Sequence, residues 1–369
     1  MARPYTAAVR IALTHALCWP EVRRGAERFI PSLGAALVRR GHEVVHYSAA
    51  WNPGDEVVDG VVTIRMRRRF ADLHRHEADF GRRLLPRLLS GRFDAVHSLG
   101  RHDALASLRA ARLRRSRRTV ITDLGLPNRA YWNGFGRREA RTVEKVVAQI
   151  DVYSGMSRCA VDELAREYGR TDGVVVPGGV DTSAFVPAAS RSPDPVILFS
   201  GAFDEPVKEV PLLLEALALV ARSEPSVELW LSGPGDGEKT LAEADPAARE
   251  RTRVLGLGDA RRQHERYGRA WVTCLPTRFD SFGMALVESL ACGTPLVTTT
   301  EGAPHELVDP GVTGELTVPG DSAELARALL RGLELARDPA TAAACRASAE
   351  PFDWDKGLAP LTEHLYAGG

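Results

Sequence analysis

The 369-residue chain lacks the features that mark several protein classes. Its five cysteines are odd in number and form no Cys-x-x-Cys pair, which argues against a disulfide framework and a structural zinc site. No stretch approaches the ~20 uninterrupted apolar residues of a membrane-spanning helix. The opening MARPYTAAVRIALTHAL is interrupted by Arg10 and has no convincing cleavage site, so we expect no signal peptide. Together these absences predict a protein of the reducing cytoplasm.

Several ligand-binding motifs are also missing. There is no Gly-x-Gly-x-x-Gly fingerprint and no Walker loop. No Asp-x-Asp motif lies in a turn suited to a metal, so we expect a site without a metal ion. Arginine clusters occur at 65–69 and 114–118, but stacking aromatics are not interleaved with them, and we expect no nucleic-acid partner.

The formal net charge of zero hides an asymmetry along the chain. Residues 1–190 contain 31 Lys and Arg against 20 Asp and Glu, a net +11, and the remainder contains 17 against 28, a net −11. A basic half can attract an anionic acceptor or a membrane surface. Solvated helix faces and mutual attraction of the two halves explain the same numbers, and we prefer this plainer interpretation.

Short apolar runs alternate with helix-length segments along the whole chain, which predicts α/β folding with parallel sheets covered on both faces. Apolar residues make up 44% of the chain and charged residues 26%, as in globular proteins. The expected strands are 9–15, 42–48, 60–66, 94–99, 119–124, 152–156, 173–178, 195–201, 227–233, 252–257, 270–276 and 295–300. The expected helices include 25–41, 157–169, 210–223, 284–293 and 321–337.

Two such series predict two doubly wound, Rossmann-like domains. Periodicity is lost at 186–195, VPAASRSPDP, so we place the domains at 1–187 and 188–350. Residues 351–369 have apolar side chains at helical spacing, which predicts a terminal helix across the domain boundary. Simple core burial would give the same pattern.

The turns that follow the strands are the candidate binding segments, because ligands of open parallel sheets bind beyond the carboxyl ends of the strands. Gly25 follows the first strand and would let the backbone approach an anion, although a glycine opening a helix is common. Lys208 precedes an apolar helix and is placed to neutralise a diphosphate. It is one of four lysines in the chain, but most surface lysines have no such role.

The segment PTRFDSFGMALVESLACGTPLV at 276–297 places Asp280 at the end of a strand and Glu288 inside the following helix. Gly283 turns the chain between them, and the free backbone N–H groups in the first turn of the helix form an anion-binding site. The two carboxylates could then accept hydroxyl hydrogen bonds on either side of a phosphate, as a sugar nucleotide requires. An exposed turn Asp and a solvated helix Glu fit the same spacing.

The segment LPTRFDSFGMALVESLACGTPLVTTTEGAPHELV resembles the donor-binding region of retaining glycosyltransferases of family 4, which have the GT-B fold. That family shows a Glu, a Gly-Phe-Gly turn and a second Glu eight positions later. Further similar segments are GAERFIPSLGAALVRRGHEV, VVVPGGVDTSAF, GVTGELTVPGD and FDWDKGLAPLTEHLY. The resemblance therefore extends over nearly the whole chain.

The resemblance implies a role for each matching residue. Glu288 would bind the ribose of the donor, Asp280 the transferred sugar, and Lys208 the diphosphate. The backbone at Phe282, Gly283 and Met284 would contact sugar and phosphates. Gly25 and its neighbours would close over the pyrophosphate.

Two histidines match less clearly. His97 corresponds to the first histidine of the family's Val-His segment, and we expect it to be a buried packing residue. The second histidine of that segment is Leu99 here, and His102 is the candidate substitute as a catalytic residue.

Two departures from the family pattern stand out. Ala202 occupies the place of an arginine that would neutralise the diphosphate, so one of two expected cations is missing. Asp280 replaces the first Glu and retracts its carboxylate by about 1.5 Å. A lost charge-assisted contact costs ~1.5–3 kcal/mol unless another arginine replaces it.

The resemblance thus implies a metal-independent, retaining glycosyltransferase without a cofactor, whose substrates are a nucleotide-diphosphate sugar and a hydroxylated acceptor. It implies that the N-terminal domain binds the acceptor, that the C-terminal domain binds the donor, and that the last helix packs back on the N-terminal domain. We favour a small-molecule or natural-product acceptor. A membrane lipid, a polysaccharide precursor, or a non-catalytic nucleotide-binding partner subunit is the alternative.

Overall fold

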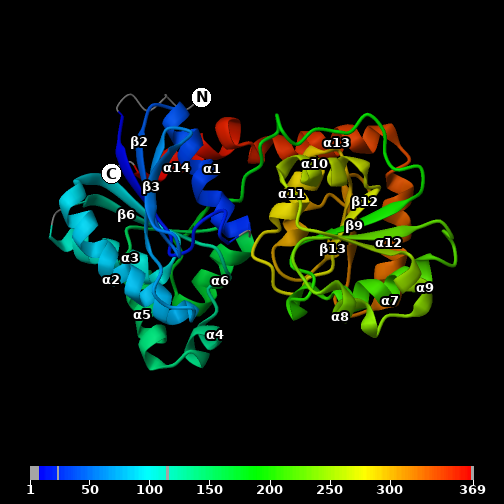
Figure 1. Cartoon of the computed structure of the whole chain (residues 1–369), viewed down its shortest axis with the longest axis horizontal. Helices are drawn as coiled ribbons and strands as arrows, with labels where there is room; N and C mark the ends of the chain where they lie inside the picture. Colours follow the sequence, from blue (N-terminus) through cyan, green and yellow to red (C-terminus); the bar gives the residue numbers. More distant parts are fainter. Residues whose placement is uncertain (1–7, 23–24, 114–115, 367–369) are drawn as a thin grey trace. The chain divides into compact units, whose positions relative to one another are not determined.

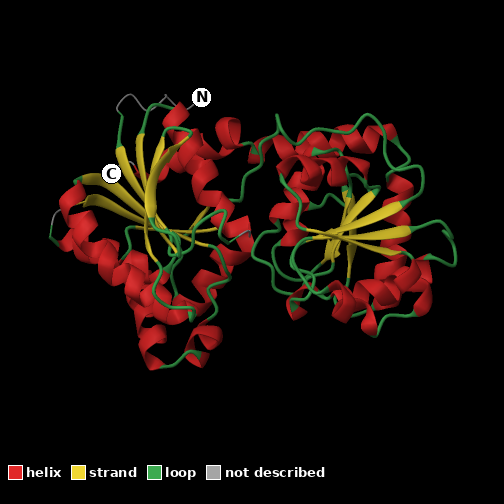
Figure 2. Ribbon diagram, in the orientation of Figure 1, coloured by secondary structure: helices red, strands yellow, loops and turns green. Residues whose placement is uncertain are grey.

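The chain folds into two compact units, each with its own β-sheet. The structure is a computed structural model that describes residues 8–22, 25–113 and 116–366. Unit 1 comprises Met1–Gly179 and Trp354–Gly369, and unit 2 comprises Val180–Asp353. Figure 2 shows that helices cover the sheet of each unit, as the alternating pattern of the sequence predicts.

The sheet of unit 1 has the strand order β3-β4-β2-β1-β5-β6-β7-β8. Neighbouring strands are parallel except β3 and β4, which pair antiparallel at one edge. The strands are β1 (Arg10–Thr14), β2 (Glu43–Ala50), β3 (Gly54–Val58), β4 (Val61–Arg67), β5 (Phe93–Ser98), β6 (Ser116–Asp123), β7 (Val152–Gly155) and β8 (Val174–Val175). Six of the seven strands expected in this half agree closely with these bounds, whereas the seventh is reduced to the two residues of β8.

Unit 1 contains the helices α1 (Gly25–Arg39), α2 (Leu73–Gly91), α3 (Arg101–Arg112), α4 (Arg129–Gly134), α5 (Arg137–Gln149), α6 (Arg158–Tyr168) and α14 (Ala359–Tyr366), with a π-helical turn η4 (Trp354–Leu358). Helix α2 begins where Asp72 accepts a hydrogen bond from the backbone N–H of Arg75, and it ends at Arg92 in the left-handed conformation.

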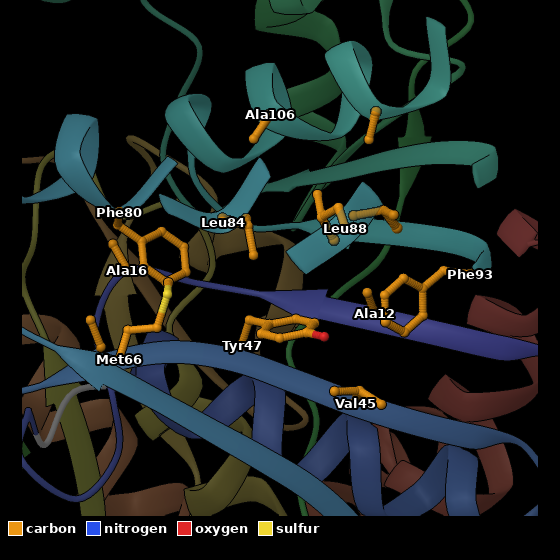
Figure 3. Close-up of a cluster of buried hydrophobic side chains, with 13 residues drawn as sticks. Ala12, Ala16, Val45, Tyr47, Met66, Phe80, Leu84, Leu88, Phe93 and Ala106 are labelled. Carbon is orange, nitrogen blue, oxygen red and sulfur yellow. The ribbon is translucent and has the colours of Figure 1, made fainter. Parts of the chain in front are cut away.

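The core between the sheet and helices α2 and α3 of unit 1 is drawn in Figure 3. Strand residues such as Ala12 and Tyr47 share one buried hydrophobic cluster with Phe80, Leu84 and Leu88 of α2, which are completely buried. Burial of one such side chain contributes roughly 1.5–3 kcal/mol. The apolar stripe of α2 therefore fixes this helix on the sheet.

The C-terminal segment packs on the N-terminal part of the chain within unit 1. Trp354 contacts the ring of Phe29 of α1 at 5.5 Å between centroids. Glu363 of α14 accepts hydrogen bonds from Arg40, at 2.5 and 2.8 Å, and lies 2.9 Å from Nε2 of His42. Burial raises the pKa of Glu363, but these two partners outweigh it and hold the pKa below its usual value. The predicted return of the last helix is confirmed.

The sheet of unit 2 is parallel throughout its described strands, in the order β11-β10-β9-β12-β13-β14. The strands are β9 (Val196–Ser200), β10 (Glu228–Ser232), β11 (Thr252–Gly256), β12 (Val272–Leu275), β13 (Leu296–Thr299) and β14 (Gly314–Thr317). The first five agree with the expected strands, and β14 was not predicted as a strand.

Two groups of helices pack together in unit 2: α7 lies against α12 and α9, and α11 lies against α10 and α13 (Figure 1). The α-helices are α7 (Val210–Val220), α8 (Gly237–Ala242), α9 (Pro246–Glu250), α10 (Ala260–Arg269), α11 (Met284–Ala291), α12 (Ser322–Leu335) and α13 (Pro339–Ala349). The 3-10 turns are η1 (Pro206–Lys208), η2 (Pro304–Leu307) and η3 (Glu350–Phe352).

The units divide at Gly179–Val180, before the stretch 186–195 in which the sequence pattern placed the joint. The intervening residues are bonded to unit 2. Arg346 of α13 donates hydrogen bonds to the carbonyl oxygens of Thr182 and Phe185, and Asp353 accepts from Thr182. Because these partners lie more than 160 residues away, the local loss of periodicity does not reveal them.

Candidate active site

The loops that follow β9 and β12 start side by side in unit 2, because these strands are neighbours in the sheet. Both leave the carboxyl edge, where open parallel sheets bind ligands. The loop after β9 leads to η1 and Lys208, and the loop after β12 leads through Asp280 to α11.

Lys208 and Asp280 meet at this edge. The lysine Nζ donates a hydrogen bond to Oδ2 of Asp280 at 2.5 Å, and the two side chains are 19% and 18% exposed. Oδ1 of Asp280 accepts from the backbone N–H of Phe282 at 3.2 Å. The structure thus joins two site residues that are 72 positions apart in the sequence.

Gly283 makes the turn into α11. It is the N-cap residue with φ 95° and ψ 60°, and no side chain caps the helix. The left-handed φ strains any residue with a Cβ, and a Cβ here would also lie a tight 3.2 Å from Cδ1 of Leu286, so the turn favours glycine. The backbone N–H groups of the first helical turn have no acceptor within the helix. Met284 is the first residue of α11, next to the loop that carries Asp280.

Glu288 is buried in the middle of α11, with only 4% of its surface exposed. The alternative of a solvated helix glutamate, which the spacing had left open, is therefore excluded. Phe282 is also 4% exposed, and the centroid of its ring lies 5.7 Å from that of Phe352. The side chain of Phe282 thus anchors the turn, which leaves its backbone as the part that can meet a ligand.

Gly25 and His102 belong to unit 1. Gly25 is the first residue of α1, and residues 23 and 24, which precede it, lie outside the described part of the chain. His102 is 8% exposed and its Nε2 lies 3.0 Å from Oε2 of Glu139. Burial lowers the pKa of His102, and Glu139 opposes this effect.

Arg101, beside His102, connects the same carboxylate to α2. Its Nε lies 2.7 Å from Glu139 and its Nη1 lies 2.6 Å from Glu77. His102 is therefore part of a packed network of charges on α2, α3 and α5.

His97 is completely buried, as predicted. Its Nδ1 lies 2.8 Å from the hydroxyl of Tyr366, and its Nε2 lies 2.7 Å from Oγ1 of Thr122. Burial lowers the pKa of His97 to about 3, so the ring is neutral. His97 thus bonds α14 to the sheet.

A second buried polar cluster in unit 1 was missed by sequence reasoning. Nε2 of His15 lies 3.7 Å from Oε1 of Glu27, and both residues are buried. Burial lowers the pKa of His15, but Glu27, Asp103 and Glu77 outweigh it and raise the pKa overall. Burial raises the pKa of Asp103 to about 6. These residues come from four separate segments of the chain, so no local motif marks them.

An ion pair in unit 2 was missed as well. Nε of Arg278 lies 2.8 Å from Oε1 of Glu209, which follows Lys208 directly. Within residues 8–22, 25–113 and 116–366, no group of three His, Cys, Asp or Glu side chains is arranged to hold a metal ion. None of the helices in these ranges is long and apolar enough to cross a membrane.

Two family models match the chain. The model described as "Glycosyltransferase Family 4" matches residues 23–184, and the model described as "Glycosyl transferases group 1" matches residues 194–334. Together they extend over most of both units.

Among curated proteins, the chain is similar to a phosphatidyl-myo-inositol mannosyltransferase of Mycobacterium tuberculosis, with 34% identity over 54% of this chain and 56% of the relative. It is 32% identical to a D-inositol 3-phosphate glycosyltransferase of Geodermatophilus obscurus over 59% of this chain and 53% of the relative. The alignments thus cover about half the length of these relatives.

Solved structures resemble the whole chain at low sequence identity. A sucrose-phosphate synthase of Thermosynechococcus elongatus has a TM-score of 0.83 at 20% identity, with 97% of this chain and 98% of that chain covered. The Anabaena HepE protein in complex with UDP and glucose has a TM-score of 0.76 at 18% identity, with 97% and 99% covered. The matched models and the shared architecture show that the chain belongs to glycosyltransferase family 4 and has the GT-B fold.

Proposed function

We propose that the chain transfers a sugar from a nucleotide-diphosphate sugar to a hydroxyl of a lipid acceptor, with retention of the anomeric configuration and without a bound metal ion. Unit 2 would bind the donor and unit 1 the acceptor, at the cytoplasmic side of a membrane. The observation that carries the proposal is the Lys208–Asp280 pair beside the uncapped N-terminus of α11.

Each group at this edge of the sheet has a task that suits a sugar nucleotide. The ammonium of Lys208 and the first-turn amides of α11 would stabilise the charge that develops on the departing diphosphate. Asp280 would accept a hydroxyl of the transferred sugar, and Glu288 a hydroxyl of the ribose. The names of similar structures agree with such a donor, since HepE is described in complexes with UDP and with UDP-glucose.

The bond between the anomeric carbon and the diphosphate oxygen breaks in this reaction, and a bond from the acceptor oxygen forms. Retention follows if the acceptor oxygen attacks from the face that the diphosphate leaves. The acceptor proton can then pass to the departing diphosphate, so the step requires neither an oxidant nor a metal.

The names of the relatives favour a lipid acceptor over the natural product that we first expected, since mannosyltransferases of phosphatidyl-myo-inositol are among them. An exposed aromatic surface of unit 1 is a second argument. Tyr131 and Phe135 are 57% and 40% exposed and their rings are 4.9 Å apart. The ring of His74 in α2 lies 4.3 Å from the ring of Phe135, measured between centroids. Leu73, which precedes His74, is 40% exposed.

Exposed arginines are close to these residues in the sequence: Arg75 follows His74, and Arg137 and Arg138 follow Phe135 by two and three positions. Aromatic side chains beside basic ones are typical of surfaces that meet anionic lipid headgroups. The combination supports an acceptor that is embedded in a membrane.

The test begins with a thermal-shift panel of UDP-, GDP-, ADP- and dTDP-sugars, which identifies the donor. The stabilising donor is then supplied, with a radiolabelled sugar, to vesicles that contain phosphatidylinositol and, separately, to soluble polyols. Label in the organic extract supports the proposal, and label in the soluble product alone refutes the lipid acceptor. Nucleotide binding without any transfer refutes the enzyme and leaves the partner-subunit alternative that Ala202 raises. Glu288→Ala is the control for specific binding.

A further inference from the structure

Two ion pairs cross between the η1–α7 junction and the loop after β12 in unit 2. Lys208 bonds to Asp280, and Glu209, the next residue, pairs with Arg278. Each segment therefore contributes one cation and one carboxylate, and each carboxylate faces the cation of the other segment.

The backbone holds the same two segments together. The carbonyl oxygen of Val207, in the residue before Lys208, accepts hydrogen bonds from Oγ1 of Thr277 at 2.9 Å and from the N–H of Arg278 at 3.2 Å. Residues 207–209 are thus bonded to residues 277–280 at three successive positions. The backbone that carries Lys208 is therefore held by hydrogen bonds to residues 277 and 278.

Glu209 has an unusual backbone conformation. Its φ of 53° and ψ of 37° are left-handed, in the gap between η1 and α7. Only Asp59 and Arg92 share a positive φ among the non-glycine residues of the described ranges. Glycine would adopt this conformation without strain. This conformation holds the carboxylate of Glu209 beside Arg278 and directly next to Lys208 in the chain.

We propose that Arg278 is a positioning residue for Lys208: by neutralising Glu209, it leaves the ammonium of Lys208 available to the donor. The proposal rests on the proposed function in one respect, namely that Lys208 neutralises a diphosphate. Neither residue needs to touch the donor. Arg278 acts through Glu209, whose carboxylate it neutralises.

The balance of charges explains why loss of Arg278 should weaken binding of the diphosphate to Lys208. In the intact protein, Glu209 is neutralised by Arg278, so Asp280 is the carboxylate bonded to Lys208. Without Arg278, Glu209 lies beside Lys208 as a second, uncompensated carboxylate. Two carboxylates then compete with the diphosphate for one ammonium, in a site from which Ala202 has already removed one expected cation.

The test measures binding of free UDP, GDP, ADP and dTDP by isothermal titration calorimetry. For the nucleotide that binds the wild type, Arg278→Ala should raise the Kd at least fivefold. Glu209→Gln alone should change the Kd less than threefold, and the double variant should return to within threefold of the wild type. Residues in contact couple in stability whatever their role, so the rescue has to appear in the nucleotide Kd, which a purely structural ion pair leaves unchanged. Glu209→Gly, which relieves the left-handed strain, serves in the double variant if the glutamine does not fold.

Arg331→Ala is the matched control. Arg331 is 52% exposed and its Nε lies 2.7 Å from Glu315, so the variant removes a comparable ion pair of unit 2. Its nucleotide Kd should equal that of the wild type. An Arg278→Ala Kd that also equals the wild type overturns the proposal.

A second measurement needs no nucleotide. The rate at which an N-hydroxysuccinimide ester acylates Lys208, relative to exposed Lys239, is followed by peptide mass spectrometry. A second carboxylate favours the unreactive ammonium, so Arg278→Ala should slow Lys208 at least threefold and the double variant should restore it. If the wild type binds none of the four nucleotides, the proposed donor site is refuted. The Lys208 acylation rates then decide the positioning proposal alone, and unchanged rates overturn it.

Discussion

Replacing His97 with glutamine should make the stability of unit 1 less sensitive to acid. The neutral ring of His97 is enclosed between Thr122 and Tyr366, and burial lowers its pKa to about 3. In the unfolded chain the same ring titrates near its ordinary pKa of 6.5. Glutamine does not titrate, so it removes this difference between the folded and unfolded states.

The sign and size of the effect follow from proton linkage. Below pH 6.5 the ring of His97 binds a proton in the unfolded chain but not in the folded protein. The unfolding free energy therefore decreases as the pH is lowered from 6.5 to about 3. One pH unit corresponds to about 1.4 kcal/mol, and pH 5 lies about 1.5 units below the unfolded pKa, which gives a loss of about 2 kcal/mol. At about pH 7.5 the loss is close to zero.

The glutamine variant should be the less stable protein at neutral pH, because it pairs imperfectly with Thr122 and Tyr366. The difference in unfolding free energy between the two proteins should then shrink by about 2 kcal/mol between pH 7.5 and pH 5. His46, whose pKa burial also lowers to about 3, is present in both proteins and cancels.

Urea unfolding followed by tryptophan fluorescence measures this quantity. Both proteins carry Trp230→Phe and Trp271→Phe, so the remaining tryptophans all lie in unit 1. A difference in unfolding free energy that stays constant with pH would refute the linkage argument. It would mean that His97 binds its proton equally in the folded and unfolded states.

Three further variants test other parts of the structure. Asp280→Asn removes the charge that Lys208 contacts, and a loss of ~1.5–3 kcal/mol corresponds to a ~10–150-fold fall in transfer rate, measured from initial velocities. Gly283→Ala forces a side chain into a left-handed turn at a cost of ~1–2 kcal/mol, so both the melting temperature and nucleotide affinity should fall in differential scanning fluorimetry. Glu363→Gln weakens the attachment of α14 to Arg40 and His42 and should lower the unfolding free energy of unit 1 by ~1–3 kcal/mol in urea.

Most of the sheet could be predicted because strands buried on both faces are continuous apolar runs. VRIALTH and PVILFSG coincide with β1 and β9 to within one or two residues. Strand β3, GDEVV, was missed because it lies at the edge and is largely exposed, so its two acidic residues hide the pattern. Strand β14 is four residues long and half-buried, and it too lacks a distinct apolar run.

The candidate site was predictable only in part. Spacing and resemblance indicated Lys208 and Asp280 as residues, but not their contact, because no local pattern relates positions 72 residues apart. The pair of Glu209 and Arg278 depends on a positive φ at a glutamate, which propensities disfavour. Burial of Glu288 depends on how α11 packs, and not on its own sequence.

The charges of the two units bear on how the substrates would arrive. Unit 2 has 16 Lys and Arg against 27 Asp and Glu, a net −11, and unit 1 has 32 against 21, a net +11. A diphosphate bound as we propose would meet repulsion from unit 2 as a whole, so its binding would have to come from short-range contacts such as Lys208 and the amides of α11. Salt screens charges beyond ~8–10 Å, so it weakens that repulsion more than the contacts themselves. The proposed anionic headgroup would be attracted to unit 1 at long range, and salt would remove this attraction. Added salt should therefore weaken binding to anionic vesicles, whereas it should leave binding of the donor unchanged or strengthen it.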